Sequence, residues 1–264
     1  MSAGKHVRRL SAGLDTIVFK TVMQKNSSKG PSVFTRVRNR FRYGLATQEV
    51  LDRLSATLGL VIYPYFFVHE QIQPGMEFTN PDDGDDYQVR YLTEHDMQLL
   101  ESRSAQRRSA GALVEKLRSG SRCLGFFVNG EPAAYTWYRL DRVPVAMWMT
   151  ELFRLEDDEA YLFDAYVLPA YRGRRLAPLV RYRAYEELKK IGRHRLYSIT
   201  LGFNASSRRF KQRLQGKETE LRLLVGFKRW KGIDIRLRAF DDHLRTPARR
   251  VLGRIRPKTP PSAS

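Results

Sequence analysis

The stretch that decides the fold lies at residues 167–177, which read VLPAYRGRRLA. An apolar run at 160–168 leads into it, and such a run is typical of a strand buried on both faces. Beyond the turn, apolar residues recur every three or four positions, which predicts an amphipathic helix. These positions are Leu176, Val180, Ala184, Leu188 and Ile191. The sequence therefore predicts a strand, an arginine-rich turn and a helix, in that order.

Such a turn has the features of an anion-binding site. The first N–H groups of a helix have no partner within the helix, and the helix dipole adds positive potential at that end. Gly173 allows the backbone to approach a ligand closely. Three arginines, Arg172, Arg174 and Arg175, add positive charge at the same point. We therefore expect a ligand that carries adjacent phosphates.

The turn resembles the signature of the GNAT superfamily of N-acetyltransferases, bacterial type, which reads Arg/Gln-x-x-Gly-x-Gly/Ala and often follows Val-x-Pro-x-Tyr. Arg172 and Ala177 match its first and last positions, and Arg175 stands where the family usually has glycine. The resemblance implies that the turn binds the pyrophosphate of acetyl-CoA or a related acyl-CoA. It also implies that the main chain near Tyr166 and Val167 receives the acyl carbonyl and the pantetheine arm.

A second part of the resemblance lies downstream. Asn204 and Ser207 match an Asn and a small residue that follow a strand in the family. Lys211 occupies the place of a tyrosine that protonates the leaving thiolate in many members. The resemblance covers about residues 87–240. It assigns the cofactor-binding residues Tyr166, Val167, Arg172, Gly173, Arg174, Arg175, Leu176, Ala177, Asn204 and Ser207.

The remaining pattern of residues 86–243 predicts an α+β domain. Further strands are expected at 87–92, 122–128, 132–138, 145–152, 195–201 and 221–227, and helices at 93–100 and 112–117. Asn129-Gly130 predicts a hairpin turn, and Thr93 with Asp96 predicts a helix cap. The resemblance implies the acyl-CoA N-acyltransferase fold, with helices on both faces of a central, mostly antiparallel sheet.

The chain outside this domain divides into two parts. Residues 1–85 form a basic extension with an aromatic strand at 61–69, where Pro64 favours an edge or irregular strand. Around Val33–Phe41, alternating arginines and apolar residues predict a basic amphipathic helix. That helix binds an anionic membrane or another polyanion, or its apolar stripe packs on the main domain. Residues 244–264 form a basic tail rich in Pro and Ser.

Charge and composition limit the classes of function. The 47 Lys and Arg against 28 Asp and Glu give a net charge of +19. Either a polyanionic partner or a solvated, arginine-rich surface accounts for that charge. The single cysteine, Cys123, excludes an internal disulfide framework. The sequence has no run of 18 apolar residues and a poor secretory signal, so we expect a cytoplasmic protein, peripheral to the inner face of the membrane if the basic helix binds lipid.

The chemistry expected is direct acyl transfer to an amine, without a covalent enzyme intermediate. Two carboxylates are candidate proton acceptors, Glu151 and Asp164. Burial within an apolar strand would raise the pKa of Asp164 toward a useful range, although a salt bridge or a cap is the alternative role. Strand alternation places Asp164 on the face opposite Phe163. The five histidines show no metal-ligand spacing, so no metal is expected.

The leading hypothesis is an N-acyltransferase that moves an acyl group, acetyl by resemblance, from acyl-CoA to an amine. The acceptor could be an amino sugar, an amino acid, a polyamine or a protein lysine, and the basic surface favours an anionic one. One alternative is a macromolecular donor, either aminoacyl-tRNA or acyl carrier protein. Another is a non-catalytic nucleic-acid-binding protein, because basic residues alternate with aromatic ones in its C-terminal third.

Overall fold

A computed structural model describes residues 51, 57–70, 78–81, 84–103, 111–143, 153–227 and 233–241. The basic helix predicted around Val33–Phe41, the strand predicted at 145–152 and the C-terminal tail lie outside these residues. The elements in chain order are β1 (Leu60–Glu70), β2 (Tyr87–Tyr91), α4 (Glu94–Arg103), α5 (Ala112–Arg118), β3 (Arg122–Val128), β4 (Glu131–Arg139), β5 (Arg142–Val143), β6 (Phe153–Arg154), β7 (Glu159–Val167), the 3-10 turn η2 (Pro169–Tyr171), α6 (Leu176–Lys190), β8 (Arg195–Leu201), α7 (Ala205–Arg213), β9 (Lys217–Phe227) and β10 (Ile233–Ala239).

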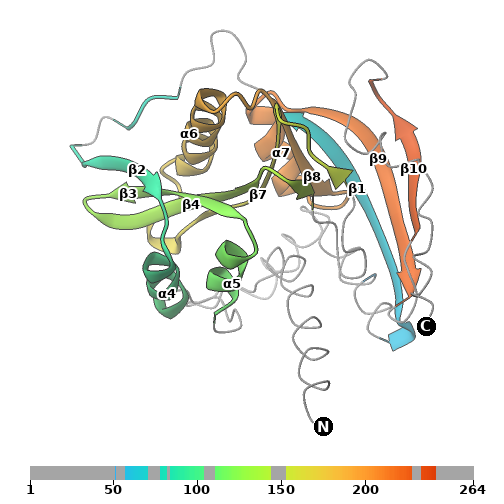
Figure 1. Cartoon of the computed structure of the whole chain (residues 1–264), viewed down its shortest axis with the longest axis horizontal. Coiled ribbons are helices and arrows are strands. Elements are labelled where there is room, and N and C mark those ends of the chain that lie inside the picture. The colour runs from blue at the N-terminus through green and yellow to red at the C-terminus, as the bar shows by residue number, and fades with distance from the viewer. Residues whose placement is uncertain are drawn as a thin grey trace, which may run out of the picture.

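One eight-stranded sheet organises the domain, in the order β10-β9-β1-β8-β7-β4-β3-β2. Strands β7 and β8 are parallel, and every other pair described in this sheet is antiparallel. Helices α6 and α7 lie on one face, and α4 and α5 lie on the other (Figure 1). The short strands β5 and β6 form a separate ribbon. The predicted α+β fold, with helices on both faces of a mostly antiparallel sheet, is confirmed.

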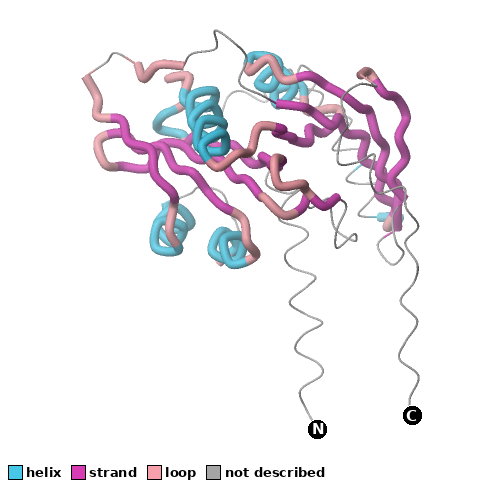
Figure 2. Tube along the Cα trace, turned by 45° about the horizontal axis from the view of Figure 1, so that its top comes forward, coloured by secondary structure: helices cyan, strands magenta, loops and turns pink. Residues whose placement is uncertain are grey.

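Each face of the sheet carries its own apolar core. On the α6 side, Leu162 of β7 packs with Ala184 and Leu188 of the helix. On the opposite side, Leu113 of α5 packs with Trp137 of β4. The coloured trace shows these two helical layers on either side of the twisted sheet (Figure 2). Within the described residues, no helix is long and apolar enough to span a membrane.

Pro64 predicted an edge or irregular strand, and β1 is not an edge strand, although its pairing with β9 has an irregularity between Phe67 and Val68. It lies inside the sheet, between β8 and β9. The N–H and C=O of one residue point toward the same neighbouring strand. The Pro64 carbonyl accepts from Gly202 N–H at 2.7 Å, just beyond the end of β8. The missing N–H of Pro64 therefore faces the end of β8 and removes no bond to β9. The predicted boundary at residue 85 thus falls after a strand that belongs to the same sheet.

Two local signals produce the geometry that the sequence predicts. Asn129 and Gly130 have φ angles of 51° and 78°, as a two-residue hairpin turn requires, and they join β3 to β4. At the start of α4, Thr93 N–H donates to Asp96 Oδ2 at 2.8 Å, and Asp96 N–H donates to Thr93 Oγ1 at 3.3 Å. This reciprocal pair is a capping box. Both signals depend only on residues that are neighbours in the chain.

Candidate active site

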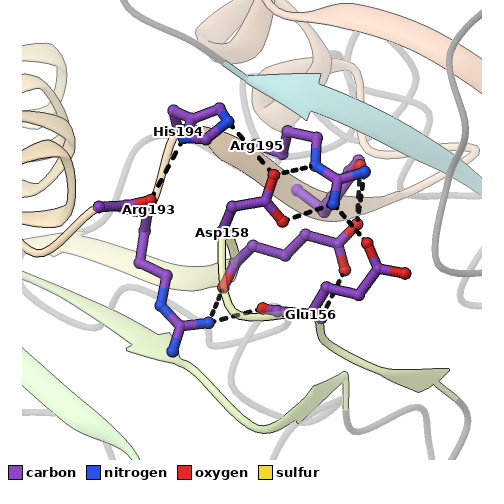
Figure 3. A network of polar contacts seen from close by, with 8 residues as sticks. Glu156, Asp158, Arg193, His194 and Arg195 are labelled. Carbon is purple, nitrogen blue, oxygen red and sulfur yellow. Dashed lines mark hydrogen bonds and ion pairs between the residues drawn. The ribbon is translucent and has the colours of Figure 1, made fainter.

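The candidate site begins where β7 and β8 separate. The two strands pair only from Glu159 with Arg195 to Tyr161 with Tyr197, within the described residues. Charged side chains tie this paired end together (Figure 3). The Arg195 Nε lies 2.6 Å from Asp158 Oδ2, and the Arg193 side chain donates to the main-chain carbonyl of Glu159 at 3.0 Å. Beyond these charged contacts, β7 continues to Val167 beside β4, and β8 continues beside β1. The sheet therefore opens at its centre.

A bulge in β7 accompanies the opening. Tyr135 pairs with Tyr166, whereas Trp137 pairs with Phe163, so β7 has one residue more than β4 across this interval. Asp164 lies in the bulge with a φ of 48°, a left-handed conformation that is uncommon for a residue with a side chain.

The bulge changes the direction in which Asp164 points. Its Oδ2 lies 2.7 Å from Lys116 Nζ, and the same ammonium lies 5.4 Å from the Phe163 ring centroid. Asp164 and Phe163 therefore face α5 together. The prediction from strand alternation, which put them on opposite faces, was wrong because the bulge interrupts the alternation. The expected salt bridge is present, so Asp164 is not in purely apolar surroundings. Glu151 lies outside the described residues.

Main-chain groups near Tyr166 and Val167 were predicted to bind the acyl carbonyl and the pantetheine arm, and of these two residues Val167 faces the opening. Leu168 N–H donates to the Ala133 carbonyl of β4 at 2.9 Å. Successive residues of a strand direct their N–H and C=O to opposite sides. Val167 therefore directs its N–H and C=O away from β4, toward the opening. Both residues lie opposite β4, Val167 beside Ala134 and Tyr166 beside Tyr135, but by the same alternation the N–H and C=O of Tyr166 point toward β4.

The turn after β7 contains four backbone N–H groups that have no acceptor among the described residues. Gly173 has a φ of 91°, and Arg175 ends the turn in the left-handed region with a φ of 58°. A Cβ at Gly173 would meet no heavy atom within 4 Å, so the backbone is open there. In the described part of the chain, the N–H groups of Gly173, Arg175, Leu176 and Ala177 donate to no protein acceptor. The geometry suits the oxygens of a phosphorylated ligand.

The arginines of the turn have different surroundings. Arg172 is exposed, and its guanidinium lies 3.3 Å from Tyr166 Oη and 3.4 Å from the Val167 carbonyl. It therefore lies over the end of β7, beside the opening. Arg174 forms a short ion pair with Asp85 and donates to Tyr87 Oη at 2.6 Å. Its charge is already compensated, so Arg172 is the better placed of the two to meet a ligand.

The Asn204 segment has a structural role in addition to the predicted one. Asn204 is the N-cap of α7, and its side-chain oxygen accepts from Ser207 N–H at 2.9 Å. The Ser207 hydroxyl lies 3.3 Å from Thr200 Oγ1 of β8. These contacts fix the start of α7 against β8. Whether either residue touches a ligand stays a prediction.

Lys211, at the position of the family's tyrosine, belongs to a buried charge cluster. Its ammonium forms a short ion pair with Glu70 of β1. Arg181 of α6 pairs with the same carboxylate, with Nε 2.9 Å from Oε2. The hydroxyls of Tyr185 and Ser198 also donate to Glu70. The Lys211 ammonium is therefore held inside the domain rather than free at the opening.

Burial and neighbouring charges set the ionisation of this cluster. Removal from water lowers the pKa of Lys211 to about 7, and Glu70 opposes that shift while Arg181 adds to it. Burial acts to raise the pKa of Glu70, but the two cations outweigh it and the pKa lies below its ordinary value. Glu70 is thus the anion that compensates Arg181.

The sequence model of the Acetyltransferase (GNAT) family matches residues 84–216. The chain belongs to this family. The match begins before β2 and ends after α7, so it contains the opened strands, the turn and the Asn204 segment. Strand β1, which supplies Glu70, precedes the matched region.

Solved structures of GNAT acetyltransferases and other proteins resemble this chain at low sequence identity. A Drosophila protein is 14% identical with a TM-score of 0.44, and the match covers 69% of this chain and 58% of that one. An aminoglycoside 6'-N-acetyltransferase from Acinetobacter baumannii is 15% identical with a TM-score of 0.38, covering 50% and 92% of the two chains. A ribosomal-protein-alanine N-acetyltransferase from Brucella melitensis is 17% identical with a TM-score of 0.37, covering 49% and 90%. No curated protein sequence matches this chain.

Two residues of this GNAT domain, Lys116 and Glu70, were not predicted from the sequence. Lys116 reaches Asp164 from α5, 48 residues earlier in the chain, and Glu70 reaches Arg181 over 111 residues. A lysine in a short helix and a glutamate at a strand end carry no local signal of burial. Across the described ranges, no group of three His, Cys, Asp or Glu side chains is arranged to hold a metal ion.

Proposed function

We propose that this GNAT protein transfers an acyl group, acetyl by family resemblance, from acyl-CoA to an amine. The observation that carries the proposal is the set of N–H groups of Gly173, Arg175, Leu176 and Ala177, which donate to no acceptor within the described residues and directly follow the strand that borders the opening. These donors and Arg172 would hold the pyrophosphate. Val167 N–H and C=O would bind the pantetheine arm. The bound thioester supplies the activated acyl group.

The residues of the chain then position and deprotonate the amine. The amine nitrogen forms the new C–N bond with the acyl carbon as the thioester C–S bond breaks, CoA departs as its thiolate with the electron pair of that bond, and the amine nitrogen releases one proton. Asp164 lies in the bulge beside the opening, and we propose its carboxylate as the acceptor of that proton. Cys123 is buried among apolar side chains and is not proposed as a nucleophile. Positioning two substrates supplies much of the rate in such a direct transfer.

Isothermal titration with CoA tests the donor site. Arg172→Ala should weaken CoA binding by about 1.5–3 kcal/mol, which is the worth of a charge-assisted hydrogen bond. Arg183→Ala is the matched control, because Arg183 lies on α6 and pairs with Glu186 at 2.9 Å. Equal CoA affinity in the wild type and Arg172→Ala would remove Arg172 from the site.

The same titration separates the competing functions. If the wild type does not bind CoA but does bind tRNA or an acyl carrier protein, the donor is a macromolecule and this proposal is wrong. Binding of duplex DNA that collapses as salt rises, again without CoA binding, would support a nucleic-acid-binding protein.

A further inference from the structure

Two hydrogen-bond donors, Trp137 Nε1 and Lys116 Nζ, lie close together between α5 and the sheet, beside the bulge of β7. Trp137 is fully buried, and its Nε1 has no hydrogen-bond partner among the residues that the structure describes. Lys116 Nζ lies over the same ring, 4.8 Å from the Trp137 centroid. Within the described residues, its single hydrogen-bond acceptor is Asp164 Oδ2 at 2.7 Å.

The chemistry of these two donors shows which kind of partner would complete their hydrogen bonds. An indole N–H can only donate, and an ammonium has three protons and no lone pair. A buried N–H without an acceptor costs about 1–3 kcal/mol, so natural proteins rarely leave one without a function or a ligand. Trp137 and Lys116 cannot satisfy each other. Within the described residues the Trp137 N–H has no acceptor, whereas the Lys116 ammonium has one acceptor, Asp164, for its three protons and can bind a further oxygen.

The position of this cluster connects it to the opened strands. Trp137 pairs with Phe163, and Asp164 follows in the bulge. The side chains of Lys116 and Asp164 keep 10% and 16% of their surface exposed, whereas Trp137 has none. The ion pair is therefore the part of this cluster that solvent reaches. Aromatic rings of β4 and β7 pack next to the ion pair: Trp137 on Phe163, Phe163 on Tyr161 and Tyr135 on Tyr166.

We propose that the acceptor is an amino acid, whose carboxylate binds Lys116 Nζ and Trp137 Nε1 and whose amine lies against Asp164. This inference rests on the proposed function and names its acceptor class. Lys116 and Asp164 form a pair of opposite charges, which a zwitterion with its amine and carboxylate a few atoms apart complements without adding net charge. A phosphate monoester carries up to two negative charges and would leave the cluster with an excess of them.

Pairs of acceptors that differ only in the carboxylate test whether the acceptor is an amino acid. Each common amino acid and its carboxamide are assayed with acetyl-CoA, and release of the CoA thiol is followed. The wild type should acetylate at least one amino acid with a kcat/KM about 10-fold or more above that of its carboxamide, because a hydrogen bond to a charged group is worth that factor. Equal rates for acid and amide, or a faster reaction with glucosamine 6-phosphate, would overturn the proposal.

Trp137→Phe tests the geometry, because it keeps the ring under Lys116 and removes only the N–H. The KM for the amino acid should rise about 10-fold, while the KM values for the carboxamide and for acetyl-CoA stay unchanged. Lys116→Met should have the same effect. If Lys116→Met fails to fold, the result for Trp137→Phe alone tests the geometry. Tyr138→Phe is the control, because it removes a hydroxyl from the next residue, which bonds Tyr91 at 2.9 Å.

The outcomes separate this proposal from the proposed function. If Trp137→Phe retains the full preference for the acid, the indole N–H meets an internal water and the proposal is wrong. If no amine is acetylated while the wild type still binds acetyl-CoA, the acceptor assignment fails and the donor site stands. If the wild type does not bind acetyl-CoA, both fail.

Discussion

At the scale of single residues, Arg175 occupies a conformation that suits glycine. It begins α6 with φ and ψ of 58° and 23°. A residue with a Cβ adopts this region at a cost of about 1–2 kcal/mol. The family's preference for glycine at this place therefore has a steric reason, and this chain retains the fold in spite of the strain.

Replacing Arg175 should reveal that strain. Arg175→Gly should stabilise the fold by up to about 1 kcal/mol, because relief of the strained φ exceeds the added entropy of the unfolded chain. Urea unfolding measures the change. The same substitution within the helix, Arg183→Gly, should cost about 1 kcal/mol. Equal losses at both positions would show that the conformation of Arg175 is not strained.

Lys211 should make the stability depend on pH. Its pKa is about 7 in the folded chain and has its ordinary value, near 10.5, in the unfolded chain. Between these values the unfolded chain holds a proton that the folded chain lacks, so stability rises with pH. It should rise by up to about 1.4 kcal/mol per pH unit between pH 7 and 10.

Urea unfolding at pH 7, 8 and 9 checks this slope against Lys211→Met. The variant has no ammonium at this place, so the gain in stability with pH should be smaller than in the wild type. Lys189→Met, at an exposed position of α6, should keep the wild-type slope. An unchanged slope in Lys211→Met would show that Lys211 remains protonated throughout this range.

At the scale of elements, α7 depends on its cap. The helix has nine residues, and Asn204 satisfies the N–H of Ser207 in its first turn. A helix this short is marginal in isolation, so its cap and its packing against β8 decide its position. Asn204 was also predicted to contact the cofactor, and the two roles can be separated.

Two substitutions at Asn204 separate them. Asn204→Ala should cost about 1 kcal/mol of stability, whereas Asn204→Ser, which can still cap, should cost little. Unfolding measures the cap and CoA titration measures the contact. A loss of CoA affinity in Asn204→Ser at unchanged stability would show that the amide itself meets the ligand. Unchanged affinity would limit Asn204 to capping.

At the scale of the whole molecule, β1 completes the GNAT domain. It lies between β8 and β9, and its last residue, Glu70, is the buried partner of Arg181 and Lys211. Removing one member of a buried ion pair leaves an uncompensated charge, which is more damaging than losing the pair. The region that matches the family therefore depends on a strand that precedes it.

Glu70→Leu should destabilise the protein by about 3–5 kcal/mol, because Arg181 and Lys211 would remain buried without an anion. Thermal or urea unfolding measures this loss. The double variant Glu70→Leu, Lys211→Met should recover part of the stability, since one buried cation is removed. Glu94→Gln, at an exposed pair with Arg118, should have little effect. A tolerated Glu70→Leu would show that the cluster does not couple β1 to the domain.

The sequence by itself determined those features that depend on neighbours in the chain. The run from 160 to 191 gave strand, turn and helix in the predicted order, because periodicity and glycine placement act over a few residues. The cap at Thr93 and the turn at Asn129-Gly130 followed for the same reason. The family resemblance also came from this one stretch and the Asn204 segment.

Only the tertiary structure decided how distant residues meet. The place of β1 inside the sheet depends on which strand edges pair, and Pro64 misled because its missing N–H faces the end of β8. The bulge turned Asp164 toward Lys116, which no alternating pattern could predict. Within the described residues the Trp137 N–H lacks an acceptor where α5 packs over β4, and a missing hydrogen bond of this kind depends on packing and not on sequence.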